Sequence, residues 1–259
     1  DAGAEALSPL FARYCGVGDG ETSTLAVRAA CALGARASAK ARKATVGPQL
    51  CGPCLAATQK LLEAGDEARA VECFDALVDV AADGAAFFAK LDGDLARLVG
   101  AAANADAFEA TTRGRALEVA LALCEAAPAL ARRNAAVFVQ SLVPVAVGLS
   151  RAVEDDAAAA WAGRPCELAP LGERDDESDH AKAGDDALKR LCGALGKQVA
   201  PALLEFCGQA FGSASWVDAR CGLAALNALA LGAPKELKPH VATAAAVAAQ
   251  TIAAPAADP

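Results

Sequence analysis

The sequence predicts an all-α protein built from paired helices, and three observations support this prediction. Hydrophobic residues make up 55% of the 259 residues, yet only 4% are aromatic, and alanine and leucine dominate. Small and unbranched side chains allow close helix packing and lose little rotamer entropy in a helix, whereas the β-branched and aromatic residues that favour strands are sparse. The third observation is an internal repeat, which shows how the helices are organised.

One heptapeptide pattern recurs along the chain. Residues 71–77, 117–123 and 223–229 superpose without gaps, and an earlier copy, 27–33, lies 44 residues before the first. The later three copies run into turn-forming residues such as Gly84, Pro128 and Pro234. Repeats of roughly 40–47 residues with two helices each are typical of HEAT and armadillo proteins. The predicted fold is therefore an α-α superhelix, a HEAT-repeat solenoid.

A proline marks the second helix of several pairs. Pro53, Pro144 and Pro201 each lie near the expected start of an apolar helix. Proline costs little in a first turn and kinks a helix when it lies deeper, and for Pro144 both alternatives remain open. We expect a leading helix and five pairs, in order 5–15, 22–36/48–64, 66–82/87–103, 110–127/132–152, 185–195/198–211 and 215–231/236–252. Ser215 and Asp218 predict a capping box at the start of the last pair.

An acidic insertion divides these repeats. Between residues 154 and 186 the chain has eleven acidic and three basic residues, a net charge of −8 that equals the net charge of the whole protein. The segment contains prolines and little apolar periodicity, which predicts an extended or disordered segment. We therefore expect three regions: HEAT repeats over 1–153, the acidic insertion over 154–186, and HEAT repeats over 187–259 that are truncated at the C-terminus.

Composition also bears on the class of protein. No run of about 18 uncharged apolar residues is present, so no membrane span is predicted, and the N-terminus does not resemble a signal peptide. Met is absent, which suggests an internal segment of a longer protein. The ten Cys residues are scattered and mostly lie on apolar helical faces, as expected of buried thiols in a reducing, intracellular compartment.

Cys51-Gly-Pro-Cys54 is the motif most suggestive of chemistry, because it matches the dithiol of thioredoxin-like oxidoreductases. In those enzymes a strand precedes the first Cys, but residues 41–50 do not have the pattern of a buried strand. Pro53 is also explained by the repeat, since Pro144 and Pro201 have no neighbouring Cys. We favour a structural role for the motif and predict that the protein is not an enzyme.

Other kinds of site find little support in the sequence. The two His residues and the Cys spacing do not form a zinc pattern, no Ser or Cys has an evident His partner, and no glycine loop for phosphate is present. We therefore expect no metal and no cofactor. The net charge disfavours nucleic acid. A small basic cluster, Arg36, Lys40, Arg42 and Lys43, is interpreted as a solvated turn between helices.

The acidic insertion has two interpretations. Acidic loops are commonly solubilising linkers, but such a loop can also attract a basic partner electrostatically. Trp161 favours the second interpretation, because a Trp in a charged segment needs a surface against which to pack.

Several motifs in this order resemble the importin-beta (karyopherin-beta) superfamily of nuclear transport receptors, and in particular importin beta-3. They are Arg115-Ala-Leu-Glu-Val119, Glu154-Asp-Asp156 before Trp161, Ala187-Leu-Lys-Arg-Leu191, Gly193-Ala-Leu-Gly-Lys197, Pro201, Ser215-Trp216, Leu223-Ala-Ala-Leu226 and Pro234-Lys-Glu-Leu-Lys-Pro239. The resemblance covers essentially the whole chain and corresponds to the central repeats of a longer family protein. This chain is richer in alanine than those receptors, and its acidic run is interrupted by apolar residues.

The resemblance implies a nuclear import receptor that shuttles between cytoplasm and nucleus through the nuclear pore. First helices would line a convex face, and second helices a concave face that binds cargo signals and the GTPase Ran. Implied partners are lysine-rich cargo proteins, Ran and nucleoporins, without direct binding to nucleic acid or membrane. Partner contacts carry over to residues of the insertion: Asp155, Asp156, Trp161, Glu173, Asp175, Asp176, Glu177 and Asp179. The alternative is a HEAT scaffold of a larger assembly without a transport role, because fold alone does not fix function.

Overall fold

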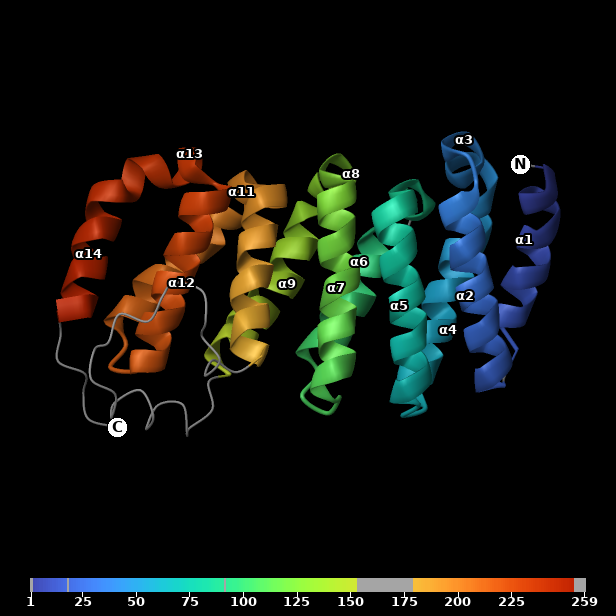
Figure 1. The fold of residues 1–259 in the computed structure, drawn as a ribbon, viewed down its shortest axis with the longest axis horizontal. Helices are drawn as coiled ribbons and strands as arrows, with labels where there is room; N and C mark the ends of the chain where they lie inside the picture. Colours follow the sequence, from blue (N-terminus) through green and yellow to red (C-terminus); the bar gives the residue numbers. More distant parts are fainter. Residues whose placement is uncertain (1, 18, 91, 153–178, 254–259) are drawn as a thin grey trace. The chain divides into compact units, whose positions relative to one another are not determined.

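The structure is a computed structural model that describes residues 2–17, 19–90, 92–152 and 179–253. The described residues form helices joined by short turns, without a strand among them (Figure 1). This confirms the predicted all-α fold with a leading helix and five pairs. The chain divides into two compact units, residues 1–142 and 143–259, with the boundary inside one helix. Each unit is described in turn.

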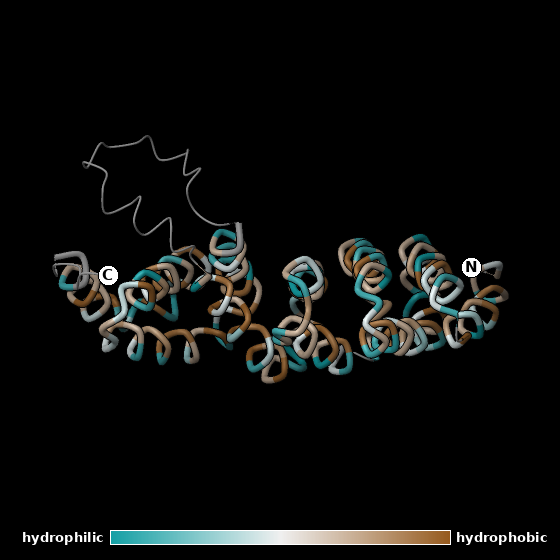
Figure 2. Tube along the Cα trace, turned by 90° about the horizontal axis from the view of Figure 1, so that it is seen from below, coloured by the Kyte–Doolittle hydropathy of each residue, from teal (hydrophilic) through white to brown (hydrophobic). Residues whose placement is uncertain are grey.

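Unit 1 contains the leading helix α1 (Ala2–Cys15) and three helical pairs. The first helices of the pairs are α2 (Gly20–Arg36), α5 (Glu67–Gly84) and α7 (Ala110–Ala126); α5 contacts both of the others. The second helices are α4 (Gly47–Glu63), α6 (Asp92–Asn104) and α9 (Ala135–Arg151). Short elements connect them: α3 (Ala39–Ala41), η1 (Arg42–Val46), η2 (Ala85–Phe88) and α8 (Pro128–Arg133). Viewed end-on, these helices lie in two layers (Figure 2).

Unit 2 contains the second half of α9 and two further pairs. Its elements are α11 (Asp179–Gly212), α12 (Trp216–Gly232), α13 (Pro234–Leu237), η3 (Lys238–His240) and α14 (Val241–Ala253). Leu195, with φ −124° and ψ 23°, interrupts α11, so this element supplies both helices of one pair. The sequence predicted this break between residues 195 and 198.

The repeated heptapeptide forms the core. Leu77, Leu123 and Leu229, which occupy the last position of three copies, and Val27, the first position of the earliest copy, are all inaccessible to solvent. Side chains of this kind contribute about 1.5–3 kcal/mol each when they are fully buried. The spacing of the repeat therefore places one apolar face of each first helix in the interior.

The start of α12 is capped as predicted only in part. The Ser215 side chain accepts a hydrogen bond from the backbone N–H of Asp218. The Asp218 carboxylate does not return to Ser215; it accepts a hydrogen bond from Ser213 and pairs with Arg151. The predicted capping box is therefore half formed, because two other partners take the carboxylate.

Two of the marker prolines lie deeper in their helices than a first turn, and the start of α11 differs from the predicted one. Pro53 is the seventh residue of α4, because the π-helical turn η1 continues the helix upstream of the expected start. Pro144 lies ten residues into α9, so it too is inside its helix rather than in a first turn. α11 begins at Asp179, so residues 179–186, which were assigned to the acidic insertion, are helical; the buried contacts of Ala181, Gly184 and Asp185 explain this extension.

Candidate functional site: the acidic insertion and its anchor

The predicted partner contacts lie mostly outside the described residues. This applies to Asp155, Asp156, Trp161, Glu173, Asp175, Asp176 and Glu177. Asp179 is the first residue of α11, and its side chain lies outside the described atoms. The role of these residues remains a prediction. The structure defines the two helices that flank the segment, α9 before it and α11 after it.

The two helices that flank this segment touch through their backbones. A Cβ atom on Gly184 of α11 would lie 2.2 Å from the backbone nitrogen of Ser150 and 2.7 Å from the carbonyl oxygen of Ala146, both on α9. Only glycine allows this approach. Because the last turn of α9 meets the first turns of α11, residues 153–178 connect two neighbouring points of unit 2.

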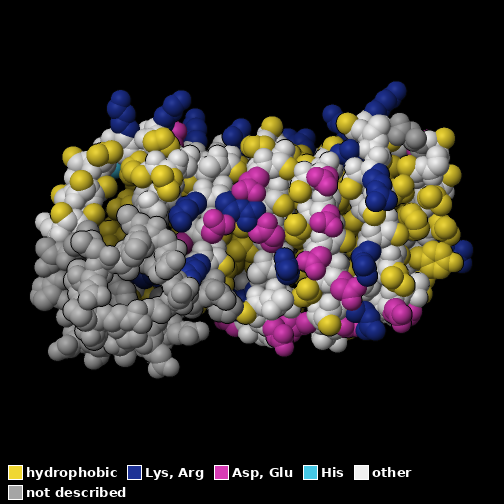
Figure 3. All heavy atoms as spheres, viewed as in Figure 1, with side chains coloured by type: hydrophobic (Ala, Val, Ile, Leu, Met, Phe, Trp, Pro, Cys, Tyr) yellow, Lys and Arg dark blue, Asp and Glu magenta, His cyan; other side chains and the backbone are white. Residues whose placement is uncertain are grey.

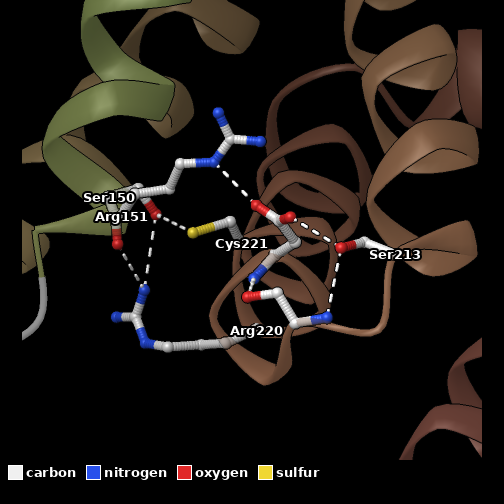
Figure 4. A network of polar contacts seen from close by, with 7 residues as sticks. Ser150, Arg151, Ser213, Arg220 and Cys221 are labelled. Atoms are coloured by element: carbon white, nitrogen blue, oxygen red, sulfur yellow. Dashed lines mark hydrogen bonds and ion pairs between the residues drawn. The ribbon is translucent and has the colours of Figure 1, made fainter.

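A polar network holds this contact together, and Figure 4 shows the part of it that joins Ser150 to Arg220. Ser150 Oγ donates a hydrogen bond to Asp185 Oδ1 at 2.6 Å. Arg220 of α12 donates through Nη2 to Asp185 Oδ2 at 3.0 Å, and through Nη1 to the carbonyl oxygen of Ser150 at 3.0 Å. Three helices are therefore linked by one arginine, one carboxylate and one hydroxyl, which we call the anchor network.

A second branch fixes the last residue of α9. Arg151 Nε lies 2.8 Å from Asp218 Oδ1, and Ser213 Oγ donates to Asp218 Oδ2 at 2.8 Å (Figure 4). The Arg151 guanidinium also lies 5.4 Å from the centre of the Phe206 ring, a distance at which a cation–π interaction is favourable. The helix end before the insertion is therefore held by both α11 and α12.

Burial makes the anchor network energetically important. Ser150 is inaccessible, and the side chains of Arg220 and Asp185 are only 22% and 20% exposed. Burial raises the pKa of the neighbouring Cys221 thiol, although hydrogen bonds with Ser150 and Arg220 act in the opposite direction. Removing one partner of a buried charge pair leaves the other charge uncompensated, which is far more destabilising than losing a pair in water.

The sequence did not reveal this network. Asp185 was counted within the acidic insertion. In the chain, Ser150 lies 35 residues before Asp185 and 70 residues before Arg220, so no local pattern connects them. A usable signal was Gly184, an isolated glycine in an alanine-rich helical segment, since such a glycine often marks a close backbone approach.

The Cys51–Cys54 motif is buried within α4, where Cys51 is 1% and Cys54 0% exposed. A hydrogen bond with Cys15 lowers the pKa of the Cys54 thiol, but the hydrogen bond with Cys31, burial and the neighbouring thiols outweigh it and raise this pKa well above its ordinary value. The hydrogen bond with Cys54 and burial likewise raise the pKa of Cys15. A reactive dithiol needs the opposite shift, so this geometry gives the oxidoreductase hypothesis no support.

The described residues show neither a metal site nor a membrane-spanning helix. No group of three or more His, Cys, Asp or Glu side chains among them is arranged to hold a metal ion. Within the same residues, no helix combines the length and the apolar character needed to cross a bilayer.

The described first helices of unit 1 carry a second concentration of acid. On α5, Glu72, Asp75, Asp79 and Asp83 are exposed and spaced by three or four residues, which places them on one helix face. Acidic side chains run along α5 in Figure 3. Arg28 of α2 pairs with Glu72 at 3.0 Å, and Arg115 of α7 pairs with Asp75 at 3.3 Å, so part of this charge is already neutralised by neighbouring repeats.

Part of the chain matches a known family model. Residues 105–201 match the family model of the importin repeat. The match includes α7, α9, the insertion and the first helix of α11, so the acidic insertion falls inside the matched region.

Solved structures of the karyopherin Kap121p share the fold. The complex with Nup53p matches with a TM-score of 0.82 and 20% sequence identity, over 97% of this chain and 24% of that chain. The complex with RanGTP matches with a TM-score of 0.74 and 21% identity, and the complex with Pho4p with 0.74 and 19%. The chain therefore spans about a quarter of the length of these karyopherins. At such identities the likeness establishes the HEAT-type helical-repeat fold.

Proposed function

We propose that this chain is a segment of a nuclear import receptor of the importin-beta (karyopherin-beta) superfamily. It acts by binding cargo, Ran-GTP and nucleoporins rather than by catalysis, and it shuttles between cytoplasm and nucleus. The observation that carries the proposal is the importin-repeat match over residues 105–201. The Kap121p structures, which include complexes with Nup53p, Pho4p and RanGTP, support it through the shared fold.

The importin beta-3 type is the finer part of this proposal. It is supported by the order and spacing of the motifs from Arg115 to Pro239, which span both units of the chain. These motifs include Trp216 at the start of α12 and Pro234 at the start of α13, so they coincide with helix boundaries.

The acidic insertion is the proposed contact for a lysine-rich partner. Its net charge of −8 is more negative than the net charge of any described second helix. Among those helices, α9 has no carboxylate and α4 has only Glu63. A basic ligand bound along the second helices would therefore depend on the insertion for most of its electrostatic attraction.

Direct binding measurements test the receptor proposal. The 259-residue chain is titrated with Ran loaded with GTP, with Ran loaded with GDP, and with a fluorescent lysine-rich peptide, using fluorescence anisotropy. We expect binding of the lysine-rich peptide and a preference for Ran-GTP over Ran-GDP.

The scaffold alternative predicts a different outcome. A HEAT scaffold without a transport role would bind neither form of Ran selectively and would not retain the peptide at physiological salt. Absence of both interactions would overturn the receptor proposal. An uncharged glycine-serine peptide of equal length is the control for non-specific binding.

A further inference from the structure

Unit 1 has a basic edge formed by the turns that join first and second helices. The turns comprise residues 36–46, 83–90 and 127–134, and we call them the turn edge. Its cations are Arg36, Lys40, Arg42, Lys43, Lys90, Arg132 and Arg133. In Figure 3, Lys and Arg side chains project from the upper edge of this unit, above α3. The first turn alone contributes four cations and no carboxylate.

Two arginines bind the three turns to one another. Arg42 donates through Nη1 to the carbonyl oxygen of Asp83 at 3.0 Å, and through Nε to that of Ala37 at 2.8 Å. Arg133 donates through Nη2 to the carbonyl oxygen of Ala89 at 3.0 Å. The turn of the second pair is therefore held on both sides by arginines of its neighbours.

The first two turns are also in backbone contact. A Cβ atom on Gly47 would lie 2.6 Å from the carbonyl oxygen of Arg42 and 2.6 Å from that of Phe87. The backbone of the turns is thus tightly packed, and such preorganisation of the turns reduces the entropy lost when a partner binds.

Several cations of this edge differ from many arginines elsewhere in unit 1 in whether a carboxylate pairs with them. Arg28, Arg69, Arg97, Arg113 and Arg115 each pair with a carboxylate. Arg36, Lys40, Lys43 and Lys90 are exposed, and the described residues offer none of them a carboxylate partner. Their charge is therefore available to a ligand.

We propose that the turn edge of unit 1 is a docking surface for an acidic polypeptide segment in extended conformation. Neighbouring repeats lie roughly 10 Å apart, so the three turns span about 20 Å. At about 3.3 Å per residue, this distance corresponds to an extended segment of about six residues. The surface is separate from the acidic insertion and would take a ligand of opposite charge.

The observations favour polypeptide over nucleic acid as the ligand. Single strands are bound by cations interleaved with exposed aromatic side chains on which bases stack. The aromatic residues of these turns, Phe87 and Phe88, are buried at 1% and 0% exposure. The edge therefore offers charge without a stacking platform.

Charge reversal on the intact chain tests this proposal. A fluorescent peptide of about eight glutamates, somewhat longer than the span of the edge, is titrated at low and physiological salt. The edge variant is Lys40→Glu/Lys43→Glu. The matched control is Arg13→Glu/Lys60→Glu, which changes the net charge equally at exposed positions in the last turns of α1 and α4, away from the turn edge. Circular dichroism verifies that both variants are folded.

We expect the glutamate peptide to bind in a salt-dependent manner, with a loss of about tenfold in the edge variant and less than about twofold in the control. Equal losses in the two variants, or no binding at low salt, would overturn the proposal. Tighter binding of oligothymidylate than of the glutamate peptide, with the same sensitivity to the edge variant, would also overturn it and assign the edge to nucleic acid.

Discussion

Ion pairs link neighbouring helices in both units, but their surroundings differ. In unit 1, Arg28 and Glu72 join α2 to α5 with side chains 55% and 50% exposed. In unit 2, Arg220 and Asp185 join α12 to α11 at the same distance of 3.0 Å, with side chains 22% and 20% exposed. The distance is equal, so the difference between the pairs lies in burial and in the additional bonds to Ser150.

This comparison indicates where the fold depends on charge. An exposed pair is screened by water and salt and typically contributes about 0–1 kcal/mol. A largely buried pair with satisfied hydrogen bonds can cost several kcal/mol when one partner is removed. The anchor network is therefore structural, whereas the exposed pairs of unit 1 add little to stability.

The largest expected effect comes from Gly184→Val. Its side chain would enter the backbone of α9 near Ser150, so the contact between α9 and α11 must open, and we expect a loss of at least about 3 kcal/mol in the free energy of unfolding. Urea denaturation followed by circular dichroism measures this. Gly148→Ala on α9, where a Cβ meets no atom within 4 Å, is the control and should stabilise by about 0.5–1 kcal/mol. Similar effects of the two substitutions would refute the close contact.

Asp185→Ala should cost about 2–3 kcal/mol, because it leaves the Arg220 guanidinium and the Ser150 hydroxyl without their acceptor. The double substitution Asp185→Leu/Arg220→Met should recover much of this loss, since it removes both charges together. Urea titrations of Asp185→Leu, of Arg220→Met and of the double variant provide the measurement. Losses that simply add would show that the two side chains do not act as a pair.

Alkaline pH should weaken both units through their buried thiols. Burial raises the pKa of Cys73 in unit 1 and of Cys207 in unit 2 to about 11 from a model-peptide value near 9. Stability is unaffected below pH 9, where both states are protonated, and falls as pH rises from 9 to about 11, where only the unfolded state ionises. The loss approaches about 2–3 kcal/mol per thiol. Urea titrations at several pH values should show a shallower decline for Cys73→Ala; an unchanged slope would argue against the shift.

Arg28→Ala should change the free energy of unfolding by less than about 1 kcal/mol, because the Glu72 carboxylate that remains is solvated. The small effect should shrink further in high salt. Thermal unfolding at low and high salt measures it. A loss comparable to that of Asp185→Ala would remove the distinction between the two regions.

The sequence predicted the helices well because one apolar pattern recurs in four of the five pairs. Val27, Leu77 and Leu123 are buried for the reason that made the repeat visible: each first helix needs one apolar face. The break in α11 near Leu195 was predicted from Pro201, which marks the beginning of a second helix.

The anchor network and the turn edge could not be predicted in the same way. They depend on contacts between residues 35 to 71 positions apart, such as Ser150 with Cys221 and Arg42 with Asp83. Periodicity places residues on a helix face but does not specify which carbonyl or carboxylate an arginine on a neighbouring element will reach. The predicted start of α11, residue 185, is six residues late because residues 179–184 were counted with the acidic insertion, whereas Ala181 is buried and Gly184 packs against α9.

The proposed role of the insertion is tested most directly by the affinity of a lysine-rich peptide measured at increasing salt, with and without the charge of the insertion. In the test variant, every Asp and Glu between residues 154 and 178 becomes Asn or Gln, which preserves the length of the segment and leaves Asp185 in place. We expect a steep salt dependence for the unmodified chain, and a loss of about tenfold or more in affinity for the variant at low salt. Equal affinities and equal salt dependence would contradict the proposal that the insertion holds a basic partner.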